Sequence, residues 1–181
     1  MFKNLTQQDI YVTLFSFFAA FFLIRSALEK SKKELLRYQM CDCIMGIFVG
    51  MAALSFSGII MNTFALLRNG AVFRYEKIAN NKAVIIITTL LSIGLGLLFN
   101  NNGTWGLLPV IAVAEYTLVI MLSKNIRVIK LGLILNCSLW GVYHFYIRSF
   151  PMCFGLMLVI AISAYSLFEK DRIPERTTSE V

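Results

Sequence analysis

The hydrophobic positions of this chain gather into seven long runs that are separated by short polar breaks. The runs cover about residues 10–27, 38–55, 56–74, 83–100, 105–123, 128–147 and 150–168. Each run is close to the ~20 residues that a helix needs to cross the hydrocarbon core of a bilayer. The pattern therefore predicts an all-α integral membrane protein with seven transmembrane helices.

Charged or turn-forming residues mark most of the breaks, for example at 30–33, 80–82, 100–103 and 124–125. The break at Ser55–Ser57 is less marked, and we place it there because a continuous apolar run from 38 to 74 is too long for one crossing. After the last run, residues 170–181 are polar and contain Pro174, so we expect a disordered tail.

The composition supports a membrane protein and leaves little room for anything else. The chain is 58% hydrophobic and 15% charged, whereas soluble domains are ~45–50% apolar and ~25% charged. A separate soluble catalytic domain does not fit into 181 residues that already hold seven spans. The four cysteines lie in apolar runs without metal-site spacing, so we expect neither a metal site nor a cofactor.

The net charge of +7 is best explained by membrane topology. With seven spans, 15 of the 17 Lys and Arg residues fall on one side, and Lys3 and Arg148 remain on the other. Basic residues favour the cytoplasmic side, so the N-terminus is predicted outside and the C-terminus in the cytoplasm. We expect anionic lipid headgroups as partners and no nucleic acid. A homodimer is one option for its assembly.

The sequence weakly matches itself at an offset of 94 residues. Lys30 corresponds to Lys124 and Cys43 to Cys137, and Ser55-Phe56 corresponds to Ser149-Phe150. The matches predict two parallel three-helix units, at about 10–74 and 105–168, joined by a linker helix at 83–100. The linker is needed because three crossings leave the chain on the opposite side of the membrane. SWEET sugar carriers have this 3+1+3 arrangement; chance matches in an ordinary seven-helix bundle are the alternative.

Three stretches, at 33–38, 106–111 and 136–145, resemble the YgjV-type family of small bacterial inner-membrane proteins. The resemblance covers roughly residues 30–170 and implies a multi-pass inner-membrane location, without a substrate. It is also compatible with a wider relation to the SWEET or PQ-loop architecture. The Pro-Gln dipeptide of those carriers is absent, so their gating mechanism does not transfer directly.

No nucleophile–base pair, paired catalytic carboxylates or phosphate loop is evident, so we do not expect an enzyme. The most informative polar stripe is Asn136, Trp140 and His144, which recur every four residues and share a helical face with Tyr143 beside them. Such a face suits the wall of a cavity for a polar solute. An interhelical polar seam with an outer aromatic belt is the alternative. Asn62 could add a further cavity group.

Three charged residues lie within the predicted spans. Asp42 and Arg68 should reach similar depths in neighbouring helices, so we expect a structural ion pair, with a gating or coupling role as the alternative. Glu115 lies near the middle of its helix, where only Arg68 is at a comparable depth. A lone carboxyl there favours its protonated form, which predicts proton coupling. A neutral carboxyl hydrogen-bonded to Asn136 or a tyrosine is the alternative.

These features favour a small polar solute carrier with SWEET-like alternating access that is proton-coupled through Glu115. A membrane scaffold or accessory subunit is the alternative, in which the polar residues specify only helix packing. The two hypotheses differ in one structural expectation. In a carrier, Asn62, Glu115, Asn136, Trp140 and His144 converge on one cavity; in a scaffold they lie in separate helix seams.

Overall fold

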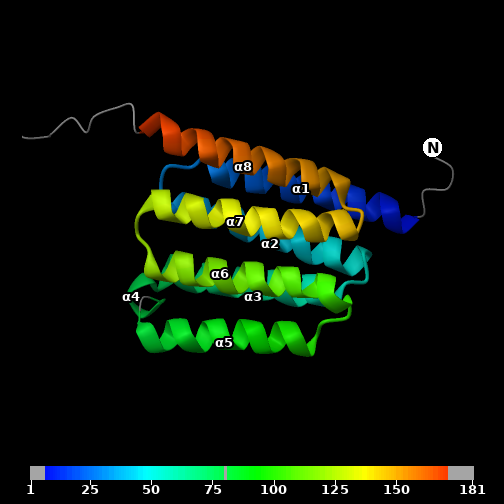
Figure 1. Cartoon of the computed structure of the whole chain (residues 1–181), viewed down its shortest axis with the longest axis horizontal. Helices are drawn as coiled ribbons and strands as arrows, with labels where there is room; N and C mark the ends of the chain where they lie inside the picture. The colour runs from blue at the N-terminus through cyan, green and yellow to red at the C-terminus, as the bar shows by residue number, and fades with distance from the viewer. Residues whose placement is uncertain (1–6, 80, 171–181) are drawn as a thin grey trace, which may run out of the picture.

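Helices make up nearly all of residues 7–79 and 81–170, which are the residues that the computed structural model describes (Figure 1). In chain order the elements are α1 (Gln7–Leu28), α2 (Lys32–Ala52), α3 (Phe56–Arg74), α4 (Glu76–Ala79), α5 (Lys82–Leu98), the 3₁₀ turn η1 (Gly103–Gly106), α6 (Leu107–Leu122), α7 (Ile126–Tyr146) and α8 (Phe150–Lys170). The all-α fold with seven long helices is confirmed, and no strand occurs in the described residues.

The helix bounds follow the apolar runs with two differences. The helix α2 begins at Lys32, six residues before its apolar run, because the helical backbone continues through the basic cluster at its start. The one-turn helix α4 lies in the break before α5 and was not expected. At the chain end, Lys170 still belongs to α8, and the remainder of the predicted disordered tail, 171–181, lies outside the described residues.

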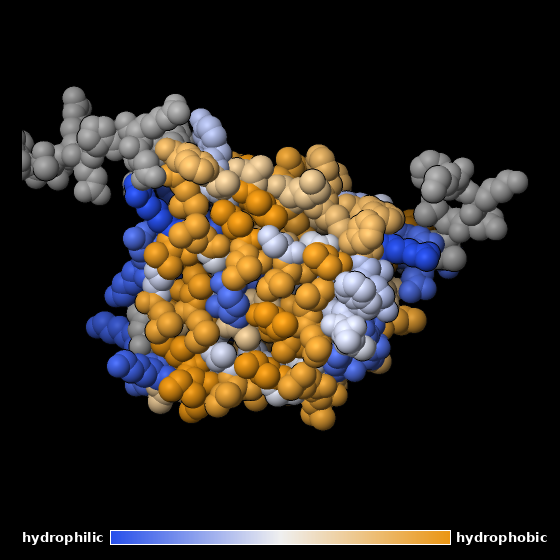
Figure 2. Space-filling view, viewed as in Figure 1, coloured by the Kyte–Doolittle hydropathy of each residue, from blue (hydrophilic) through white to orange (hydrophobic). Residues whose placement is uncertain are grey.

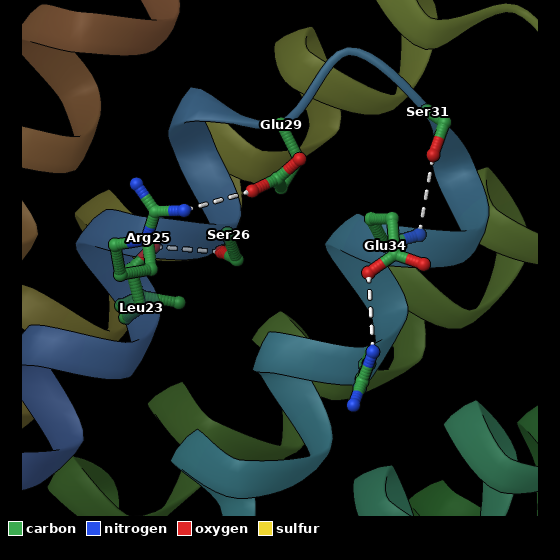
Figure 3. Close-up of polar contacts among 7 residues, drawn as sticks. Leu23, Arg25, Ser26, Glu29, Ser31 and Glu34 are labelled. Atoms are coloured by element: carbon green, nitrogen blue, oxygen red, sulfur yellow. Dashed lines mark hydrogen bonds and ion pairs between the residues drawn. The ribbon is translucent and has the colours of Figure 1, made fainter.

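Polar side chains at the breaks form hydrogen bonds and ion pairs at the ends of the helices. The Ser31 hydroxyl accepts a hydrogen bond from the Glu34 amide at 3.3 Å at the start of α2. At the end of α1, the Arg25 guanidinium donates to the Glu29 carboxylate at 3.3 Å (Figure 3). Such contacts satisfy backbone amides that a helix start leaves without partners, or place opposite charges one helical turn apart. These contacts stabilise the connection between α1 and α2 on both sides.

The long helices form two layers (Figure 1). The helices α1, α2 and α3 lie in chain order in one layer, and α8, α7 and α6 lie over them in the other. Across the layers, α1 packs against α8 and α3 packs against α6. The helix α5 lies at the edge of the bundle, where it packs against α6 and α3.

The two ends of the bundle differ in charge. The connections after α1, α3 and α6 and the end of α8 all lie at the left end in Figure 1, and the basic clusters belong to these connections. Hydrophilic residues are concentrated toward the ends of the face shown in Figure 2, with a broad apolar surface between them. The basic clusters at 30–33, 74–82 and 124–130 therefore share one end of the molecule, as the seven-span pattern predicted.

Large apolar side chains are exposed on the outside of this bundle, and several polar ones are buried inside it. Phe17 and Leu98 are 65% and 76% exposed, whereas Arg68 is 5% exposed in the interior. Among the described residues, five helical segments are long and apolar enough to cross a membrane, namely α1, α2, η1 with α6, α7 and α8. Of the other two, α5 has 17 residues, and α3 carries amide and guanidinium side chains along its middle. Membrane crossing by α3 and α5 therefore stays a prediction.

The backbone repeats the offset of 94 residues that the sequence suggested. The helix α2 spans Lys32–Ala52, and α7 spans Ile126–Tyr146, each bound lying 94 positions after its counterpart. The turn after α2 has a left-handed residue, Leu54 at φ 51°, and the turn after α7 has Arg148 at φ 58°. Both turns are closed in the same way, by amide-to-carbonyl bonds of 2.9 Å from residue 55 to 50 and from residue 149 to 144.

Candidate functional site

A small cavity lined by both polar and apolar side chains lies between the two layers of helices. Its volume is about 50 Å³, which leaves room for a few water-sized groups. Six of the residues singled out in the sequence line it: Asp42, Asn62, Arg68, Asn136, Trp140 and His144. Asp42 comes from α2, Asn62 and Arg68 come from α3, and the last three come from α7. Chain segments that are far apart in the sequence therefore contribute to one cavity.

The cavity lies where the two predicted units meet. Five pairs of its lining residues are separated by the repeat offset: Ala19 and Val113, Gln39 and Leu133, Asp42 and Asn136, Gly46 and Trp140, and Asn62 and Leu156. Equivalent positions of two units approach each other near an axis that relates the units. Both layers therefore present the same backbone positions to the cavity, with different side chains.

The stripe on α7 lies on the cavity as predicted, except for Tyr143. The rings of Trp140 and His144 lie 5.6 Å apart between centroids, and His144 is 4% exposed. The Nδ1 atom of His144 is buried and has no hydrogen-bond partner in the described part of the protein. Tyr143 is not among the residues that line the cavity; its hydroxyl group hydrogen-bonds to the Ser55 hydroxyl at the start of α3.

A polar cluster closes the bundle at the end opposite the basic connections. The Asn102 side-chain amide donates to the Ser55 hydroxyl at 2.7 Å and to the Ser57 hydroxyl at 3.2 Å. The hydroxyl groups of Ser16 on α1 and Ser149 before α8 lie 2.6 Å apart, and both residues are fully buried. Ser55 and Ser149 are 94 positions apart, so each of the equivalent turns is tied to another helix or connection at this end.

The predicted ion pair between Asp42 and Arg68 does not form. The two side chains line the same cavity, but no ion pair within 4.0 Å joins them. The Arg68 guanidinium donates instead to Asn69 Oδ1 from Nε at 3.1 Å and from Nη2 at 2.9 Å. Its Nη1 atom donates to Thr117 Oγ1 at 2.9 Å and to the Val113 carbonyl at 3.3 Å. Arg68 is therefore held by its neighbour and by α6.

Asp42 has no hydrogen-bond or ion-pair partner in the described part of the chain. The similar depth of Asp42 and Arg68 was a correct reason to expect them in one cavity. Depth alone does not determine the direction in which a side chain extends, and the donors of Arg68 extend toward α6.

Glu115 lies apart from the other predicted site residues. It lines a mainly apolar groove of about 470 Å³ between α5 and α6, and its Oε2 atom is buried without a hydrogen-bond partner in the described residues. The expected partner Asn136 donates instead to the Ala112 carbonyl at 2.8 Å. Tyr116, the next residue along α6, faces the cavity. The expectation that Glu115 shares one cavity with Asn62, Asn136, Trp140 and His144 is therefore wrong, because Glu115 lines a different pocket.

Gln39, Asn69 and Tyr116 also line the cavity and were not singled out in the sequence. Gln39 is 3% exposed, and its side-chain amide donates to the Tyr116 hydroxyl at 2.8 Å. The sequence could have identified Gln39, because it precedes Asp42 by three residues and therefore lies on the same face of the helix. For Tyr116, no periodicity in the sequence separates it from other aromatic residues.

A bundle with an apolar outer surface and a polar, largely enclosed centre defines a multi-pass membrane protein with an internal polar site. The chain belongs to the Imp-YgjV family, described as bacterial inner membrane protein, whose match spans residues 10–172. This confirms the resemblance found in the sequence and the inner-membrane location. The comparisons found no match among curated proteins or solved structures. A relation to SWEET carriers stays a prediction.

Proposed function

We propose that this protein carries a small polar solute across the bacterial inner membrane by alternating access. The two three-helix units, α1–α3 and α6–α8, move relative to each other around the central cavity, and α5 links them in a 3+1+3 arrangement. The N-terminus lies outside and the C-terminus lies in the cytoplasm. Anionic headgroups contact the basic clusters at the cytoplasmic end.

The observation that carries this proposal is the polar cavity at the junction of the two units. Carriers built from parallel repeats bind their substrates near the bilayer midplane at the repeat interface. Five equivalent pairs of residues line this cavity, which supports a position on the axis between the units. Buried polar groups in a membrane are costly to maintain, and charged groups among them commonly mark a solute or ion pathway.

The volume of about 50 Å³ is below the ~300–1,000 Å³ of open ligand pockets. In this proposal, the described conformation is a closed state of the transport cycle. The cluster of Ser55, Ser57, Asn102 and Tyr143 closes the outer end. Opening requires these hydrogen bonds to exchange for bonds to water, which is a modest cost because each contributes only ~0.5–1.5 kcal/mol net.

The proposal is tested by transport into proteoliposomes with a matched pair of glycine variants. A Cβ atom at Gly46 would lie 2.6 Å from Asn62 Oδ1, so Gly46→Ala displaces a cavity side chain. A Cβ atom at Gly141 would meet nothing within 4 Å, so Gly141→Ala serves as the control. Both changes raise helix propensity equally, and only Gly46 lies on the cavity.

The assay follows the entry of sugars, amino acids, small organic cations and organic acids into liposomes with and without the protein. We expect protein-dependent entry of one solute class, which Gly46→Ala reduces strongly and Gly141→Ala does not. If no solute class enters faster with the protein, the carrier proposal is wrong. Equal entry with both variants would mean that transport does not use this cavity. In both cases the scaffold hypothesis becomes the better account.

A further inference from the structure

Three amide side chains of the cavity each use an N–H donor on a protein acceptor and keep their carbonyl oxygen without a bond in the described residues: Gln39, Asn62 and Asn136. Asn62 donates its Nδ2 amide to the Gly58 carbonyl at 2.9 Å, and Asn136 donates its Nδ2 amide to the Ala112 carbonyl at 2.8 Å. A backbone carbonyl can only accept, so these contacts fix which end of each side chain is the amide. The carbonyl oxygens of both side chains remain available for a ligand.

Two buried atoms at the cavity have no hydrogen-bond partner in the described part of the protein, so they are available to a ligand. These are Gln39 Oε1, whose own amide is used by Tyr116, and His144 Nδ1. Both residues line the cavity and are at most 4% exposed. Buried acceptors normally have a hydrogen-bond donor. A ligand in the cavity can donate to Gln39 Oε1, and to His144 Nδ1 in the tautomer that carries the ring proton on Nε2.

The charged side chains of the cavity also favour a ligand that donates hydrogen bonds. The Arg68 guanidinium already makes four hydrogen bonds to protein acceptors. The Asp42 carboxyl group has no partner in the described residues, so its ionised form needs a cation or a hydrogen-bond donor beside it. An anion would compete for the engaged donors of Arg68 and face Asp42 without a counter-charge. A cation that donates hydrogen bonds supplies the counter-charge that Asp42 lacks.

We infer that the solute is a small primary ammonium cation, whose N–H groups donate to Asp42 and to the oxygen acceptors of Gln39, Asn62 and Asn136. The inference rests on the proposed carrier function, since it names the substrate class of the same cavity. The indole of Trp140 also lines the cavity and provides a surface for a cation. The cavity volume of about 50 Å³ suits an ammonium group with a very short alkyl chain and excludes a sugar in this conformation.

Binding can be followed by the fluorescence of Trp140 in purified full-length protein. The chain has two tryptophans, and Trp105→Phe leaves Trp140 as the reporter. Methylammonium is the probe, and tetramethylammonium is the matched cation without N–H donors. Sodium acetate and glucose represent anions and uncharged solutes. We expect a saturable change with methylammonium and none with the other three compounds at the same concentrations and constant ionic strength.

Two variants test the acceptors. Asp42→Asn keeps the shape and removes the charge, and we expect it to weaken methylammonium binding by about tenfold or more, as for the loss of a charge-assisted hydrogen bond. Gln39→Met keeps the length and removes an acceptor, so it should weaken binding several-fold. Glu34→Gln removes a carboxylate from the polar start of α2, outside the cavity, and should leave the affinity unchanged.

The results separate this inference from the carrier proposal. Binding of tetramethylammonium, acetate or glucose in preference to methylammonium overturns the inference. So does unchanged methylammonium binding in both Asp42→Asn and Gln39→Met, or no methylammonium binding by the wild type. Selective methylammonium binding without methylammonium entry into proteoliposomes supports the binding site and contradicts the carrier proposal. Transport of another solute class without methylammonium binding supports the carrier and overturns the ammonium inference alone.

Discussion

Arg68 is expected to stabilise the fold through Thr117 on α6 and not through Asp42. The bond from Arg68 Nη1 to Thr117 Oγ1 is 2.9 Å long, and the two residues are 5% and 0% exposed. A buried hydrogen bond to a charged group contributes ~1.5–3 kcal/mol. The double-mutant cycle of Arg68→Gln with Thr117→Val should therefore give a coupling energy of about 2 kcal/mol. Thr117 also donates to the Val113 carbonyl at 2.5 Å, and this contribution cancels in the cycle.

The matching cycle of Arg68→Gln with Asp42→Asn should be nearly additive, because no hydrogen bond or ion pair within 4.0 Å joins these residues. Sites without a shared contact usually add within ~0.3–0.5 kcal/mol. The contrast between the two cycles therefore tests the arrangement seen in the structure. The contrast does not depend on the unfolding free energy lost when the buried guanidinium is removed, because Arg68→Gln is common to both cycles.

Unfolding can be measured in detergent with a thiol-reactive dye, because Cys43 and Cys137 are free and buried in the folded protein. A coupling energy of 2 kcal/mol corresponds to roughly 4–8 °C in melting temperature for a chain of this size. The Thr117 double variant should melt higher, by that amount, than the sum of the single effects indicates. Additivity in that cycle together with strong coupling in the Asp42 cycle would refute this reasoning and restore the ion pair.

Two further predictions concern Glu115 and the topology. Glu115→Gln should leave solute binding in the central cavity unchanged, because Glu115 faces the groove between α5 and α6; loss of pH-driven accumulation with intact binding would instead support its predicted proton-coupling role. A fluorescent protein fused after Val181 should fluoresce in the cytoplasm, because basic residues favour the cytoplasmic side. An external C-terminus, detected by protease digestion of whole cells, would contradict the orientation.

Much of the candidate site followed from helical periodicity. Asn136, Trp140 and His144 are four residues apart, so any rotation of α7 that brings one to the cavity brings the others with it. The prediction that they share one cavity with Asn62 was correct for the same reason, since both helices present their most polar face to the interior. Tyr143 precedes His144 directly and points toward the Ser55 hydroxyl, which lies at the end of the bundle opposite the basic connections.

The sequence could not predict which side chains bond to each other. Glu115 and Tyr116 are adjacent on α6, yet one faces the α5–α6 groove and the other the cavity. The difference depends on the rotation of α6 about its own axis, and packing of α6 between α3, α5 and α7 determines that rotation. Arg68 likewise has a long side chain with five donors, and two of its acceptors, Val113 and Thr117, belong to a helix 45 or more residues away in the chain.

By itself, the sequence determined the helices, the positions of the turns and the sharing of one end by the basic clusters. These properties are local, because they depend on apolar runs of membrane-spanning length and on capping residues such as Ser31 and Ser55. Only the tertiary structure decided that Arg68 bonds to α6, that Asp42 has no partner in the described residues, and that the cavity amides present their oxygens. These properties depend on contacts between helices distant in the chain, where small rotations change which atoms meet.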